Sequence, residues 1–181
     1  MIICLTLVAC FYIYPVFLMV MNSFKPFGEI IGDVLALPKS FDLSNYTYVV
    51  DKMKYLLLFR NNVIITAIGI AGIVVFSSMA AYILERREGR YCKIAHAIII
   101  TPMLIPFQAI MITLLKSMNI FHLSGSKIGL GIQYWGFGIP MATFIIYNFM
   151  KTIPRELDES ATIDGASTFR TFVSIIFPLL K

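Results

Sequence analysis

Four stretches of this sequence contain no charged side chain over 22 to 24 consecutive residues, and this feature limits its fold more than any other. A helix that crosses the hydrocarbon core of a bilayer needs about 20 apolar residues. We therefore predict an all-α fold, a polytopic transmembrane helical bundle with about four full spans. The predicted spans cover residues 1–22, 61–84, 94–115 and 128–150.

The composition agrees with a membrane protein, because 59% of the 181 residues are hydrophobic and only 14% are charged. An average soluble domain has about 25% charged residues. A fifth uncharged run begins at Thr171 and reaches Lys181 after ten residues. At about 1.5 Å per residue, such a run covers only half of a ~30 Å hydrocarbon core. We expect residues 1–181 to form one transmembrane domain that is incomplete at its C-terminus, with the start of a fifth span at 171–181.

The predicted span at 94–115 contains Pro102 and Pro106, which remove backbone donors and are expected to distort its helix. Broken backbone inside a membrane is tolerated only against protein or water, so this span is predicted to face the bundle interior. Thr101 and Gln108 are therefore candidates for lining a pathway. Hydrogen bonding between packed helices is the commoner role for such residues. Tyr134 and Trp135 are interpreted as part of an aromatic belt at the membrane interface, with stacking on a sugar ring as the alternative.

The sequence lacks the residues that several classes of function require. The sequence has no Gly-x-x-x-x-Gly-Lys-Ser/Thr phosphate loop, and Cys4, Cys10 and Cys92 do not have metal-binding spacing. We predict no catalytic residue, no metal site and no cofactor, and therefore no enzyme activity in this chain. The net charge of +5 fits basic loops near anionic lipid headgroups, whereas the basic and aromatic pattern of a nucleic-acid site is missing.

The polar run that follows the fourth predicted span has the signals of a short helix at about 155–164. Pro154 suits the first helical position, where its missing N–H costs nothing. Glu156, Asp158 and Glu159 follow within the first turn and a half, where carboxylates complement the helix dipole.

A sharp stop and a second helix are predicted next. Gly165 can adopt the left-handed conformation that ends a helix, and Ser167 or Thr168 can cap a helix that continues into residues 172–176. The small side chain of Ala161 is predicted to let a partner surface approach closely.

This run resembles the cytoplasmic coupling loop of ABC importer permeases. The match consists of Glu159-Ser160-Ala161, then Gly165, Ile175 and Pro178, with Ser160 where the family pattern has alanine. Ile153-Pro-Arg-Glu-Leu and Ile163-Asp-Gly-Ala-Ser resemble the carbohydrate branch, in particular permeases similar to the smaller maltose-transporter membrane subunit. The segment that ends Ala80-Ala-Tyr-Ile-Leu-Glu-Arg86 resembles the family's Ala-Tyr-x-x-x-Arg.

The resemblance implies a fold like that of type I ABC importers and a coupling loop at 153–169 that contacts an ATPase. The residues that it assigns to coupling are Glu156, Glu159, Ser160, Ala161, Asp164, Gly165 and Ala166. It also implies cytoplasmic ABC ATPase subunits, a second permease subunit, an extracytoplasmic solute-binding protein and a sugar as partners, at the plasma or inner membrane. The alternative is a secondary transporter or channel without an ATPase. The absence of Asp, Glu, Lys and Arg from the four spans argues against a proton-coupled version of it.

The orientation follows from the basic residues in the loops. Loops 85–93 and 151–170 carry seven Lys and Arg in 29 residues, and loops 25–60 and 116–127 carry seven in 48 residues. The positive-inside rule therefore favours a cytoplasmic location for the first pair.

Overall fold

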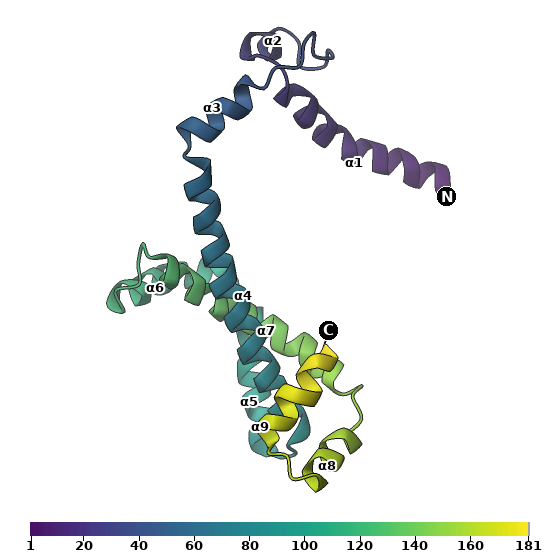
Figure 1. Cartoon of the computed structure of the whole chain (residues 1–181), viewed down its shortest axis with the longest axis vertical. Coiled ribbons are helices and arrows are strands. Elements are labelled where there is room, and N and C mark those ends of the chain that lie inside the picture. Colours follow the sequence, from purple (N-terminus) through teal and green to yellow (C-terminus); the bar gives the residue numbers. More distant parts are fainter. Residues whose placement is uncertain (181) are drawn as a thin grey trace. The chain divides into compact units, whose positions relative to one another are not determined.

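The computed structural model describes residues 1–180, and helices are the regular secondary structure that it contains there, with no strand (Figure 1). The predicted all-α class is confirmed. The chain divides into two compact units, of which the first covers Met1–Arg60 and the second begins at Asn61.

The first unit begins with helix α1 (Ile2–Ser23), which agrees with the predicted span at 1–22. Its side chains are apolar on all sides, the pattern of a helix surrounded by lipid or other helices. The connector that follows contains helices α2 (Phe27–Gly32) and α3 (Ser44–Lys52). The buried Lys25 organises this connector, because its Nζ donates to the carbonyls of Asp33 at 3.1 Å and Val34 at 3.5 Å.

The second unit is built on helix α7 (Lys127–Met150) and on helix α4 (Tyr55–Arg86), whose first six residues belong to the first unit. Helix α4 starts six residues before the predicted span at 61–84 and ends two residues after it, because the helix continues into flanking residues that are not all apolar. Helix α7 matches the predicted span at 128–150 within one residue.

Small residues let α4 and α7 approach each other closely. The indole ring of Trp135 lies over Gly72, where a Cβ atom would meet its Nε1 at 2.1 Å, and Nε1 donates to the carbonyl of Ile68 at 2.8 Å. Gly138 similarly accommodates the side chain of Ile73. The polar atom of Trp135 is thus used within a helix–helix contact, and its place in a membrane belt stays a prediction.

The predicted span at 94–115 is not one continuous helix, because the segment forms two helices with a break between them, as its two prolines led us to expect. Helix α5 (Arg90–Ile100) leads into the 3-10 turn η1 (Thr101–Leu104), and helix α6 (Phe107–Ile120) follows at an angle of 104°. Pro106 precedes α6 in an extended conformation, and it holds Ile105 in the extended region as well. The two prolines therefore break the helix rather than bend it slightly.

The C-terminal part contains α8 (Glu156–Ile163), α9 (Thr168–Thr171), the π-helix η2 (Phe172–Ile176) and the 3-10 turn η3 (Phe177–Leu180). In Figure 1 this segment, from olive to yellow, lies beside the C-terminal end of α4. A buried apolar cluster of Tyr82, Met150, Ile153, Phe172 and Ile176 joins α4, the end of α7 and η2.

By length and hydropathy, α1 and α4 are able to cross a membrane, and a third crossing exists if the bent pair α5–η1 and α6 counts as one span. The four full spans and the start of a fifth span at 171–181 stay a prediction. The structure follows this last run to Leu180, and Lys181 lies outside the described residues.

Candidate functional site

The loop between α7 and α9 begins with a tight turn. The amides of Thr152 and Ile153 donate to the carbonyls of Phe149 and Met150, which ends α7. Helix α8 then runs from Glu156 to Ile163, with Arg155 at the N-cap. Pro154 therefore lies one residue before the N-cap. The sequence had predicted it at the first helical position. Glu156, Asp158 and Glu159 occupy the first turn, where their charges face the positive end of the helix dipole.

Gly165 ends α8 in the left-handed conformation that the sequence predicted, with φ at +77°. The amide of Ala166 donates to the carbonyl of Ala161 at 2.9 Å, and the amide of Gly165 donates to that of Thr162 at 3.0 Å. This pair of bonds is a Schellman motif, which satisfies carbonyls at the end of a helix. Ser167 then caps α9, since its Oγ accepts from the amide of Arg170 at 3.3 Å.

A polar anchor holds the first turn of α8 against the end of α4. Asp158 accepts from the hydroxyl of Tyr82 at 2.5 Å through Oδ1 and from Nε of Arg86 at 2.9 Å through Oδ2. Arg86 also donates from Nη2 to the carbonyl of Ile153 at 3.1 Å and from Nη1 to Glu85 at 2.6 Å. The side chain of Arg86 is only 10% exposed, so this charge is almost completely covered by its partners.

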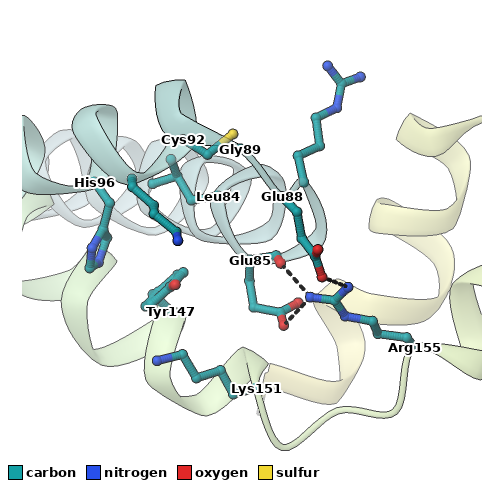
Figure 2. A pocket seen from close by; sticks show the side chains of 11 residues that line it. Leu84, Glu85, Glu88, Gly89, Cys92, His96, Tyr147, Lys151 and Arg155 are labelled. Atoms are coloured by element: carbon teal, nitrogen blue, oxygen red, sulfur yellow. Dashed lines mark hydrogen bonds and ion pairs between the residues drawn. The ribbon is translucent and has the colours of Figure 1, made fainter.

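A second, more exposed ion-pair group joins the same two parts of the chain. Arg155 donates from Nη1 to Oε1 of Glu88 at 3.0 Å and from Nη2 to the backbone carbonyl of Glu85 at 3.0 Å, and Nη2 lies 3.3 Å from Oε1 of Glu85. Figure 2 shows both carboxylates facing Arg155. The hydrogen bonds to Glu85 and then to Glu88 raise the pKa of the Arg155 guanidinium.

Ala161 is buried within the chain, and this corrects the predicted role of its small side chain. Only 4% of its surface is exposed, and it lies on the same face of α8 as Leu157, which packs against the apolar cluster under the loop. The small residue therefore lets α8 approach its own chain and does not offer a surface to a partner.

The opposite surface of the loop is open to solvent. Most of the predicted coupling residues lie on it, namely Glu156, Glu159, Ser160, Asp164 and Gly165, while Ala166 is half-buried. Two large apolar side chains of the loop are also exposed, Ile163 at 86% and Phe169 at 66%. Their contact with an ATPase stays a prediction.

Thr101 and Gln108 lie on either side of the break between α5 and α6. The hydroxyl of Thr101 donates to the carbonyl of Ala97 in its own helix at 2.7 Å, and Gln108 is exposed in the first turn of α6. The cavity at this break is lined by other residues, among them Pro102, Phe107 and Pro140. The structure therefore does not bring Thr101 and Gln108 into a common site, and their role in a pathway stays a prediction.

Sequence reasoning missed the anchor formed by Tyr82, Arg86 and Asp158. Two signals in the sequence could have indicated it. Tyr82 and Arg86 are four residues apart and therefore share a helix face. Both also belong to the segment that resembles the family's Ala-Tyr-x-x-x-Arg. The local pattern treats Asp158 only as one of three carboxylates near the helix dipole. Within residues 1–180 the structure contains no group of His, Cys, Asp and Glu that could hold a metal ion.

Comparison with known proteins shows the family of this chain. Residues 73–181 match the model of a family described as binding-protein-dependent transport system inner membrane component. The match includes the end of α4, the broken segment, α7 and the whole anchored loop.

Curated relatives align with almost the whole chain. A probable starch degradation products transport system permease protein, AmyC of Thermoanaerobacterium thermosulfurigenes, is 41% identical over 94% of this chain and 62% of its own length. The multiple sugar-binding transport system permease protein MsmG of Streptococcus mutans is 32% identical over 98% of this chain and 64% of its own length. The maltodextrin transport system permease protein MdxG of Bacillus subtilis is 30% identical over 98% and 63%, respectively. The chain thus spans less than two thirds of the length of these relatives.

Proposed function

Because the chain belongs to the family of binding-protein-dependent transport system inner membrane components, we propose that it is a membrane-spanning permease subunit of an ATP-driven ABC importer. Its cargo is a sugar or oligosaccharide. The names of AmyC, MsmG and MdxG, which refer to starch degradation products, multiple sugars and maltodextrin, support this substrate class.

The observation that carries the proposal is the anchored loop at 153–169. Its short helix α8 is fixed to α4 through Asp158 and Arg86, while Glu159 of the same helix remains exposed to solvent. A segment that transmits force needs a rigid connection to the spans and a free surface for the motor, and this loop has both.

The mechanism uses two arrangements of the permease, one open to each side of the membrane. In this proposal an ATPase dimer contacts the exposed face of α8 from the cytoplasm, and its closure displaces α8 as a rigid unit. The Arg86–Asp158 ion pair passes this displacement to α4, and the apolar cluster around Ile153 passes it to α7. The change between the two arrangements then admits the sugar from an extracytoplasmic solute-binding protein, with a second permease subunit forming the other half of the pathway.

The test compares sugar uptake with ATP hydrolysis in the full-length protein, assembled with its ATPase in vesicles. The variant Glu159→Ala removes an exposed charge, and Gly165→Pro imposes a φ of about −65° where the structure has +77°. We expect Glu159→Ala to lower uptake of a starch-derived oligosaccharide about fivefold per ATP hydrolysed, since one exposed charged contact contributes up to ~1 kcal/mol. Gly165→Pro should lower it at least as much, because it removes the turn that ends α8.

The matched control is Asp51→Ala, which removes an exposed carboxylate from α3, far along the sequence from the loop. It should leave the ratio of uptake to hydrolysis unchanged. Normal coupling in both loop variants, or sugar transport by the full-length protein with no ATPase present, would overturn the proposed function.

A further inference from the structure

A cavity of about 580 Å³ lies where the end of α4, the start of α5 and the end of α7 meet. Its charged lining residues are Glu85, Arg87, Glu88, Lys93, Lys151 and Arg155. Four cations and two carboxylates give this lining a formal charge of +2 (4 − 2). The cavity is therefore electropositive before any ligand enters.

The two carboxylates are already used by arginines. Glu85 pairs with Arg86 through Oε2 and with Arg155 through Oε1, and Glu88 pairs with Arg155 through Oε1. Lys93 and Lys151 form no ion pair among residues 1–180. The excess positive charge of the cavity is thus located on these two lysines and on Arg87.

The wall that contains Lys151 is formed by polar and aromatic side chains. Its Nζ lies 4.5 Å from the centre of the Tyr147 ring, a cation–π contact, and 3.4 Å from Oδ1 of Asn148. Tyr147 also contacts the ring of His96 at 4.2 Å between centroids, and the buried Nε2 of His96 has no hydrogen-bond partner. Figure 2 shows His96, Tyr147 and Lys151 grouped on one side of the cavity, away from Arg155.

The start of α5 also contributes to the lining of the cavity. Gly89, Cys92 and Lys93 line the cavity, and Gly89 is the N-cap residue of this 11-residue helix. No side chain caps α5 and its first turn has no acidic residue, so neither a cap nor the first turn offsets the positive end of its dipole. A helix start of this kind adds to the attraction that Lys93 and Lys151 exert on an anion.

From these contacts we propose that the cavity binds a phosphate-bearing anion between Lys93 and Lys151. The lysines supply the charge, and His96 adds a polar side chain to the lining. The phosphate belongs either to the headgroup of an anionic phospholipid or to a soluble phosphate. Basic pockets between transmembrane helices at the cytoplasmic surface are suited to the first source. The proposal requires a membrane protein but not the coupling role of α8.

The experiment measures thermal unfolding of the full-length protein in neutral detergent, at constant ionic strength. Four additives are compared, which are dihexanoyl phosphatidylglycerol, dihexanoyl phosphatidylcholine, inorganic phosphate and chloride. We expect phosphatidylglycerol to raise the Tm and phosphatidylcholine and chloride to leave it unchanged. A rise with phosphatidylglycerol alone identifies a lipid, and an equal rise with inorganic phosphate identifies a soluble anion.

Two charge-matched variants locate the site. Lys93→Gln/Lys151→Gln should weaken the apparent affinity for the stabilising anion at least about tenfold, because each lysine near a membrane surface contributes appreciably to anion attraction. The control Lys52→Gln/Lys116→Gln removes the same charge from positions outside the cavity and should bind as the wild type does.

Equal Tm shifts with the anionic and zwitterionic lipids, no shift with either phosphate source, or equal loss of affinity in both double variants would overturn the proposal. If the Lys93→Gln/Lys151→Gln variant does not fold, the Tm of the wild-type protein with each of the four additives still tests whether it binds a phosphate-bearing anion. Because no step requires ATP hydrolysis or sugar uptake, a failure here is distinct from a failure of the proposed transport function.

Discussion

Nε of Arg86 lies 2.9 Å from Oδ2 of Asp158, which joins the last residue of α4 to the first turn of α8 across 72 positions in the sequence. Their side chains are 10% and 19% exposed, so water competes little for this pair. The hydroxyl of Tyr82 donates to the other oxygen of the same carboxylate. Asp158 is therefore the residue of α8 that both Tyr82 and Arg86 hold.

We predict that Asp158→Asn loosens α8. The amide cannot form an ion pair with Arg86 and leaves a nearly covered guanidinium with a weaker partner, at a cost of ~1–3 kcal/mol. Backbone amides of residues 156–163 should exchange with deuterium at least about fivefold faster in the full-length protein. Glu159→Gln makes the same chemical change one residue later on the exposed face and should not alter exchange. Unchanged exchange in Asp158→Asn would contradict the anchor.

We predict that Gly72→Ala disturbs the contact between α4 and α7. A Cβ atom at this position would lie 2.1 Å from Cε2 of Trp135, so the indole must move and lose its bond to Ile68. Overpacking of this kind costs about 1–3 kcal/mol, and the Tm in detergent should fall. Gly136→Ala is the control, because nothing lies within 4 Å of a Cβ there. A second change, Trp135→Leu, should relieve the clash in Gly72→Ala, and a failure to do so would contradict this packing.

We predict that Gly165→Ala weakens the turn after α8 by about 1–2 kcal/mol, the cost of placing a non-glycine residue in the left-handed region. The site has φ of +77°, and a Cβ atom there would have nothing within 4 Å, so conformation alone produces the effect. Gly165→Asn should be milder, since asparagine tolerates this region better. The measurement is the ratio of uptake to ATP hydrolysis, and the expected order is glycine, asparagine, alanine. The same ratio in all three proteins would show that the turn geometry is not used.

We predict that the loop at 153–169 lies on the cytoplasmic side. In full-length protein with Cys4, Cys10 and Cys92 replaced by serine, a cysteine is introduced by Ile163→Cys or by Ser124→Cys, and both positions are exposed. An impermeant maleimide added to intact cells should label the protein at position 124 only. Position 163 should react after the membrane is permeabilised. Labelling of position 163 in intact cells would place the loop outside and refute the transport mechanism.

Much of this protein was determined by its sequence alone. Long uncharged runs require helices, because a backbone surrounded by lipid must satisfy its hydrogen bonds internally, and the helices α1, α4 and α7 appear where those runs lie. The turn at Gly165 and the cap at Ser167 were equally predictable, since each depends on the conformational or hydrogen-bonding properties of one residue and its neighbours.

Tertiary structure decided which side chains meet. Local signals gave Asp158 the same role as Glu156 and Glu159, and only the approach of α8 to the end of α4 pairs it with Arg86 and Tyr82. In the same way, Trp135 has the sequence environment of an interface aromatic, but the space above Gly72 places its indole between two helices. Helical periodicity fixes the face on which a residue lies, whereas its partner depends on the packing of segments that are distant in the chain.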